Sequence, residues 1–271
     1  MDISTLFAFA TFQSTIINDM ELERKCALCH ELKFLCDSHF LPAGLYRLAR
    51  THESLNPHPV LITGRQRQKL SEQSRAFVLC RDCEARFDHE GESWMLRHCC
   101  RGQGRFLLRE RLLKRKPFFV DGDVAMYSAS NEDVQRLTYF AMSVFWRGAA
   151  YLWPIGRDSS QLLHLGPFEE QIRRYLLNDS PLPTRTALIV CVSSRSDPPL
   201  VTGYPMSYTD RKVAPFHRFY IPGLMFTLYL GKSVEAMHLC SVTDTPVHPI
   251  WVGSMSDDNF MSENSRIHKK K

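Results

Sequence analysis

The sequence predicts an α+β protein, with a small cysteine-rich module first and then an α+β domain that has a mostly antiparallel sheet. Two Cys-x-x-Cys pairs, separated by 50 residues, place the module near the N-terminus. A long amphipathic pattern covers residues 130–152, where apolar residues recur at helical spacing. Runs rich in β-branched and aromatic residues, with turn residues between them, follow from residue 186 onward.

The two cysteine pairs are the most specific signal in the chain. Cys26 and Cys29 form the first pair, and Cys80 and Cys83 form the second. Each pair can place two thiolates on one tight turn, and two such turns supply the four ligands of a tetrahedral structural Zn²⁺ site. Two alternatives stay open: unrelated buried pairs, and a redox pair of the thioredoxin type.

The module is expected to alternate short strands with helices. Residues 59–64 predict a strand, and residues 75–87 predict a strand that enters the second cysteine turn and continues as a helix. The glycines in residues 102–104 should break that helix. Residues 105–116 then predict a basic helix with an apolar stripe, ended by a proline.

The C-terminal part combines two helices with several strands. Ser130 or Asn131 can cap the long helix, and residues 166–179 predict a second helix. The predicted β runs are 186–194, 218–231 and 236–243. We therefore expect four segments: an N-terminal extension over 1–23, a zinc-binding module with its basic helix over 24–120, an α+β domain over 121–260, and a polar, basic tail over 261–271.

The net charge of +5 is concentrated in the module, just after the second cysteine pair. Basic side chains clustered in this way are suited to phosphate contacts, although a charge run is as often a solvated helix face. Aromatic residues are not interleaved with the arginines, so we expect duplex DNA rather than stacked single strands. The candidate nucleic-acid-binding residues are Arg97, Arg101, Arg105, Arg109, Arg111, Lys114 and Arg115.

No apolar run approaches the roughly 20 residues that span a bilayer. The N-terminal stretch ISTLFAFATFQSTII is short, is broken by polar residues and follows Asp2 rather than a basic segment. We therefore expect no signal peptide, no membrane association and a cytoplasmic location. In a reducing cytoplasm, paired cysteines bind metal more often than they form disulfides.

Glu84 and Asp88 follow the second cysteine pair at a spacing of four residues, which places them on one face of a helix. If the two pairs share one zinc ion, the segment that carries His39 is brought towards this helix. A histidine facing two carboxylates can act as a general base beside a divalent cation. The alternative is a solvated acidic face at the start of the helix.

At this point the residues resemble a known family. The pattern CALC…SHFLP…FVLCRDCEARF is similar to the zinc-knuckle type of HNH (ββα-metal) nucleases, over about residues 24–92. The resemblance implies a treble-clef ββα module in which His39 is the general base. It also implies structural zinc on the four cysteines, with Glu84 at the position of a ligand for a catalytic Mg²⁺ or Mn²⁺.

Three residues depart from the family pattern. Ser38 stands where the family has a metal-binding aspartate, Glu84 replaces a histidine or asparagine, and Phe87 replaces a lysine. Carboxylate oxygens bind hard cations, so Asp88 can supply the missing ligand. The variant pattern also resembles bacterial proteins of mobile and defence loci, which implies a setting in antiphage defence but no activity.

Two functions follow from these observations. The first is an HNH-like, metal-dependent endonuclease that acts on nucleic acid, with His39 as its base. The second is a non-catalytic, zinc-stabilised protein that binds nucleic acid or a protein partner. In that case residues 121–260 serve recognition or assembly, and His39 has a supporting structural role.

Overall fold

The structure is a computed structural model that describes residues 23–50, 60–63, 66–69, 73–154, 162–196, 198, 202–210, 213–243 and 245–253. The predicted extension before Glu23 and the predicted tail lie outside these residues. Among the described residues, no helix combines the length and apolar character needed to cross a membrane.

A seven-stranded sheet forms the C-terminal half, in the order β10-β11-β12-β9-β13-β8-β7. All neighbouring strands are antiparallel except β13 and β9, which confirms the α+β class with a mostly antiparallel sheet. The strands are β7 (Phe119–Asp121), β8 (Val124–Ser128), β9 (Thr186–Ser193), β10 (Gly203–Asp210), β11 (Val213–Ile221), β12 (Leu224–Leu230) and β13 (Pro249–Gly253).

The apolar sequence of the central strand β9 agrees with its burial in the sheet. β9 reads as an almost continuous apolar run and is mostly buried, as expected for a strand covered on both faces. Pro222 and Gly223 connect β11 to β12, with Ile221 opposite Leu224. The φ of Gly223 is +75°, a conformation that favours glycine in this tight turn.

One predicted strand is wrong. Residues 236–243 overlap η2 (Gly231–Cys240), a 3₁₀ segment, and then a turn. The hydroxyl groups of Ser241 and Thr243 both accept hydrogen bonds from the backbone N–H of Leu188. Because these side chains bind the start of β9, the segment packs against the sheet through polar contacts rather than extending it.

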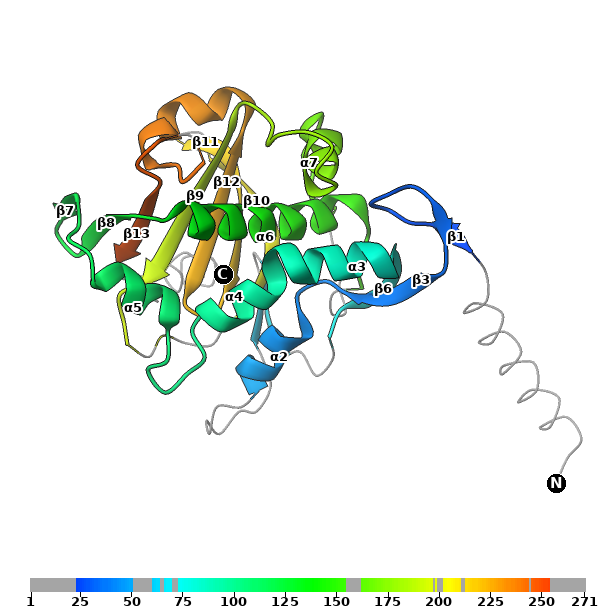
Figure 1. Ribbon diagram of the computed structural model, residues 1–271, viewed down its shortest axis with the longest axis horizontal. Helices are drawn as coiled ribbons and strands as arrows, with labels where there is room; N and C mark the ends of the chain where they lie inside the picture. The colour runs from blue at the N-terminus through cyan, green and yellow to red at the C-terminus, as the bar shows by residue number, and fades with distance from the viewer. Residues whose placement is uncertain are drawn as a thin grey trace, which may run out of the picture.

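Helix α6 (Asn131–Ala150) lies across the sheet (Figure 1) and buries most of its side chains. Its N-terminus is capped as predicted, because the Ser130 hydroxyl accepts a hydrogen bond from the backbone N–H of Asp133 at 3.2 Å. The other predicted helices are shorter than expected. They are α5 (Leu107–Leu113) and α7 (Phe168–Leu176).

The N-terminal part contains small paired strands and one long helical run. The paired strands are β1 (Arg24–Lys25) with β2 (Leu32–Lys33), β3 (Leu35–His39) with β6 (Arg75–Cys80), and β4 (Val60–Thr63) with β5 (Gln66–Lys69); α2 (Ala43–Arg50) follows β3. The helical run consists of α3 (Arg81–Phe87), the π turn η1 (Asp88–Glu92) and α4 (Ser93–His98). It ends before the glycines at 102–104, as predicted.

The helical run packs directly on α6. A Cβ atom on Gly91 would lie 3.0 Å from the Cα atom of Phe140, so any larger residue would require the two helices to move slightly apart. Beside it, the buried guanidinium of Arg147 pairs with Glu92 (Nη2–Oε1 2.6 Å) and lies 4.6 Å from the ring centre of Phe87. One continuous apolar core extends from Cys26 to Val252 and includes side chains of both halves.

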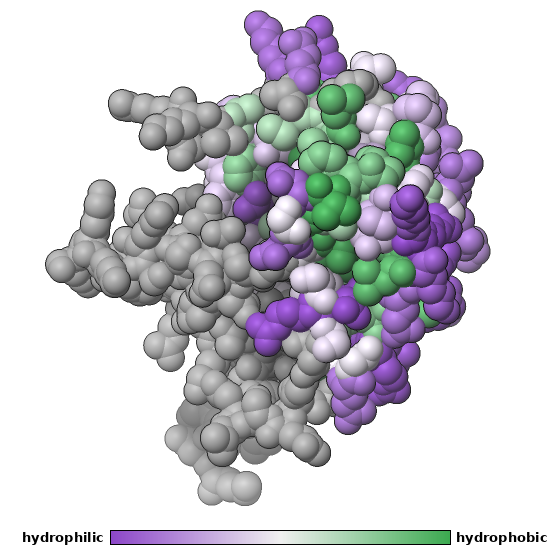
Figure 2. Space-filling view, turned by 90° about the vertical axis from the view of Figure 1, so that its left-hand side faces the viewer, coloured by the Kyte–Doolittle hydropathy of each residue, from purple (hydrophilic) through white to green (hydrophobic). Residues whose placement is uncertain are grey.

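The edge strand β7 carries exposed apolar side chains. Phe118, Phe119 and Val120 are all exposed, and β7 ends the sheet. Figure 2 views the molecule from this side and shows apolar side chains gathered among hydrophilic ones.

Candidate metal centre

The first cysteine pair lies on a tight turn between β1 and β2. Arg24 pairs with Lys33 in this short hairpin. The backbone N–H of Cys26 donates to the carbonyl of Glu31, and the N–H of His30 donates back to the carbonyl of Cys26, both at 2.9 Å. His30 takes a left-handed conformation with φ of 64°, which closes the turn. Cys26 and Cys29 therefore point to the same side.

The second pair is placed by the transition from β6 to α3. Cys80 is the last residue of β6 and precedes the first turn of α3, on which Cys83 lies. The backbone N–H of Cys80 donates to Sγ of Cys26 at 3.3 Å, which joins the two turns. The carbonyl of Val78 accepts a hydrogen bond from the backbone N–H of Ala27 at 3.0 Å, so the turn that carries Cys26 and Cys29 lies against β6.

The four cysteine sulfurs lie within 4.8 Å of one another, and all four thiols are free of disulfides. Sγ of Cys29 is 3.9 Å from Sγ of Cys80. Four thiolates about 2.3 Å from one tetrahedral Zn²⁺ ion are separated by about 3.8 Å, so this donor set fits structural zinc. A hydrogen bond from the Cys83 thiol lowers the pKa of Cys26 to about 4, while the pKa of Cys83 is raised.

His39 ends β3, directly opposite Arg75 of β6. Its side chain is half-buried, and burial lowers its pKa below the ordinary value, with the positive charge of Arg75 acting in the same direction. A hydrogen bond with the Gln73 side chain and the negative charges of Asp37 and Glu84 oppose this lowering of the pKa. The net shift favours the neutral imidazole.

The residues that precede His39 are held by other contacts. Ser38 is buried, where its hydroxyl accepts from the N–H of Leu79 and donates to the carbonyl of Cys36, both at 3.3 Å. Asp37 forms an ion pair with Arg75. Because side chains alternate along a strand, Asp37 and His39 share one face of β3 and Ser38 lies on the other.

Glu84 and Asp88 have different surroundings, although both lie on the helical run. Oε1 of Glu84 is shielded from solvent and has no hydrogen-bond partner among the described residues. Asp88 is exposed and accepts a hydrogen bond from the Ser93 hydroxyl at 2.7 Å. Within the described part of the chain, the four cysteines are the cluster whose ligand atoms come together, and His39, Glu84 and Asp88 do not form a second one.

Three of the predicted nucleic-acid-binding residues make contacts within the fold. Arg109 donates two hydrogen bonds to the carbonyl of Ser194, at 2.7 and 3.1 Å. Arg111 pairs with Asp133 at 3.0 Å, and Arg115 donates to a β8 carbonyl. The other four candidates are exposed, namely Arg97, Arg101, Arg105 and Lys114.

Gln73 and Arg75 are neighbours of His39 that the sequence pattern does not predict. Both precede the second cysteine pair, so they reach His39 only through the pairing of β6 with β3. The alternation of RAFVLC indicates a strand, but the register that sets Arg75 opposite His39 includes a bulge after Cys36.

Comparison with protein-family models, with curated proteins and with solved structures finds no match to this chain. Function is therefore inferred from the geometry of the site itself.

Proposed function

We propose that this protein is an HNH-like, metal-dependent endonuclease whose ββα module is a zinc-stapled treble clef. The cysteine cluster supports this reading because it ties the β1–β2 turn to the start of α3. β6, which pairs antiparallel with β3, leads directly into that helix; α2, β4 and β5 lie between the two strands in the sequence. A strand, a second strand and a helix thus meet at one zinc-binding cluster, in the order that the resemblance implies.

The observation that carries the proposal is a carboxylate oxygen of Glu84 that is shielded from solvent on α3, the helix that follows the strand pair bearing His39. The negative charge of Glu84 also raises the pKa of His39, although Gln73 and Asp37 do so more strongly. A buried carboxylate oxygen without a hydrogen-bond partner costs free energy unless something else binds it, and a hard cation is suited to do so. In this proposal His39 takes a proton from the attacking water, and Glu84 holds the cation.

In this proposal the catalytic cation has fewer protein ligands than in the family that the sequence resembles. A bound Mg²⁺ or Mn²⁺ ion would stabilise the charge that develops on the scissile phosphate. Ser38 makes backbone hydrogen bonds and lies on the opposite face from His39, so it does not replace the family's aspartate. Asp88 lies one turn beyond Glu84; the Ser93 hydroxyl donates to its Oδ1, so its other carboxylate oxygen can serve as a second ligand.

Incubating the purified protein with plasmid DNA and with RNA, in Mg²⁺ or Mn²⁺, tests the catalytic assignment. Wild-type protein should cut, and His39→Ala and Glu84→Gln should abolish cutting. His89→Ala is the matched histidine control, because His89 is exposed and its side chain hydrogen-bonds to the adjacent Glu90, away from the strand that carries His39. Cutting by His39→Ala at the wild-type rate would show that this histidine is not the base.

The second candidate is a non-catalytic zinc protein that binds nucleic acid or a protein partner. Asp37 and Ser38 both make other contacts, so neither provides the acidic ligand of an active family member. The exposed apolar edge at β7 supports a protein-binding role. In this case the protein retains zinc and binds without cutting under any metal. A role in antiphage defence belongs to either proposal, and phage plating on cells that carry wild type or His39→Ala separates them.

A further inference from the structure

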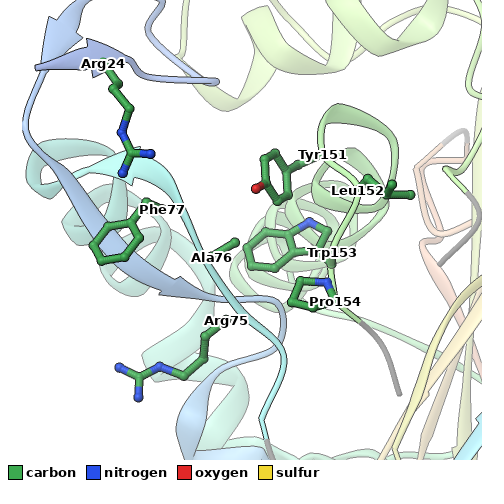
Figure 3. A pocket seen from close by; sticks show the side chains of 8 residues that line it. All are labelled: Arg24, Arg75, Ala76, Phe77, Tyr151, Leu152, Trp153 and Pro154. Carbon is green, nitrogen blue, oxygen red and sulfur yellow. The ribbon is translucent and has the colours of Figure 1, made fainter. Parts of the chain in front are cut away.

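A pocket of about 440 Å³ opens between β6 and the segment that follows α6 (Figure 3). This volume lies within the range of small-molecule sites, roughly 300–1,000 Å³. Its walls differ in chemistry. Arginines lie on the strand side, and aromatic side chains lie on the side of residues 151–154.

The strand side of the pocket is cationic. Arg24 comes from β1 and lies 5.3 Å from the ring centre of Phe77 of β6. Its Nε atom is shielded from solvent without a hydrogen-bond partner, and no acidic partner for it is found in the described part of the chain. Arg75 lies at the other end of this wall, half exposed and paired with Asp37.

The opposite wall is an aromatic platform. Tyr151 follows the last residue of α6, takes an extended conformation and is 40% exposed. It packs edge-to-face on buried Trp153, with ring centres 5.6 Å apart. The indole N–H of Trp153 donates to the carbonyl of Arg147 at 2.8 Å, which fixes the platform to α6. The Tyr151 ring is thus both accessible and rigidly supported.

Both walls touch the immediate neighbours of His39. Arg75 is the register partner of His39 across the hairpin, and directly opposite residues of an antiparallel pair project to the same face. The Trp153 ring lies 5.3 Å from the ring of Phe40, the residue after His39. Because side chains alternate along the chain here, buried Phe40 lies on the face of Ser38, opposite His39. Of the residues that line the pocket, Arg75 is the one on the face of the proposed general base.

We propose that this pocket binds one nucleotide of a single-stranded nucleic acid, with its base on Tyr151 and its backbone phosphates near Arg24 and Arg75. The inference deepens the proposed function by naming the substrate class. Single-strand sites combine a cationic track for the backbone with aromatic rings for the bases, and the two walls supply these parts.

An acidic peptide would use the two arginines but would leave the Tyr151 platform without a partner. Carboxylates and phosphates both pair with guanidinium groups, so charge alone does not distinguish the two classes of ligand. Stacking on an aromatic ring is the property that every nucleobase has and an acidic side chain lacks. The test therefore turns on the ring of Tyr151.

The test measures binding separately from cutting. Fluorescence anisotropy of a short labelled single-stranded oligonucleotide is followed in a His39→Ala background without added divalent cation. Tyr151→Ala should weaken binding about tenfold, the magnitude of one base–aromatic stack, and Tyr151→Phe should retain it. Arg24→Gln should also weaken binding and lower the slope of log affinity against log salt by about one. Arg185→Gln is the control, since Arg185 is exposed and does not line the pocket.

Several results would overturn the inference. If Tyr151→Ala bound the oligonucleotide with wild-type affinity, the ring of Tyr151 would not be part of the binding site. Equal binding of duplex and single strand, independent of Tyr151, would contradict the assigned ligand. Displacement of the oligonucleotide by an acidic peptide, undiminished in Tyr151→Ala, would favour a protein ligand. Binding is measured without His39 and without divalent cation, so it does not depend on cutting. If this binding is observed but the wild-type protein cuts with neither Mg²⁺ nor Mn²⁺, the nuclease is refuted and the pocket remains.

Discussion

Removing one zinc ligand should detach the first cysteine turn from the rest of the protein. In Cys80→Ser, a hydroxyl replaces the thiolate that lies 3.9 Å from Cys29 and also ends β6. Burial of Leu28 contributes roughly 2 kcal/mol to holding the turn. Structural zinc contributes an apparent ~10–16 kcal/mol in small zinc domains. The metal, and not the local core, is therefore expected to hold the turn in place.

The assay combines zinc content, measured by mass spectrometry of the metal, with hydrogen exchange. Wild-type protein should carry one zinc ion per chain, and Cys80→Ser should carry almost none. Amide protection should then be lost over β1 and β2 but kept in the seven-stranded sheet, whose strands pair with one another and not with β1 or β2. Cys36→Ser is the matched control, because Cys36 lies on the same hairpin outside the cluster. Full zinc content in Cys80→Ser, or zinc loss in Cys36→Ser, would refute the four-thiolate site.

Three further predictions concern packing and the pH dependence of cutting. Arg147→Met should lower the free energy of unfolding by roughly 3–5 kcal/mol, because it leaves Glu92 buried and unpaired. The double variant with Glu92→Met should recover most of this stability, and thermal unfolding measures both. Gly91→Ala should cost roughly 1–3 kcal/mol because its Cβ would lie 3.0 Å from the α6 backbone, whereas Gly148→Ala meets only ordinary contacts and should be neutral or slightly stabilising. For an active nuclease, the cutting rate should rise as His39 loses its proton, and because burial lowers the pKa of His39, that rise should lie below pH 6.5. An acid limb centred above the ordinary histidine pKa would contradict this assignment.

The cluster of four cysteines could be predicted from sequence because the two residues of each pair are only three positions apart. The antiparallel sheet could be predicted from alternating and apolar runs such as β9. The segment 236–243 could not, because its conformation depends on hydroxyl contacts with Leu188, which lies far away in sequence. Arg111 and its basic neighbours look alike in sequence, and only tertiary contacts separate those that join the helix to the sheet from those that face solvent.

Arg75 connects the two halves of the proposed site. Its guanidinium pairs with Asp37, and both residues lie on the face of the hairpin that carries His39. A phosphate that reaches Arg75 competes with Asp37 and arrives on the same face as the proposed base. A base on Tyr151 would then fix which phosphate of the strand lies beside His39. The register of β3 and β6 thus decides whether the pocket and His39 can act on one substrate. The spacing of the cysteines does not reveal this register.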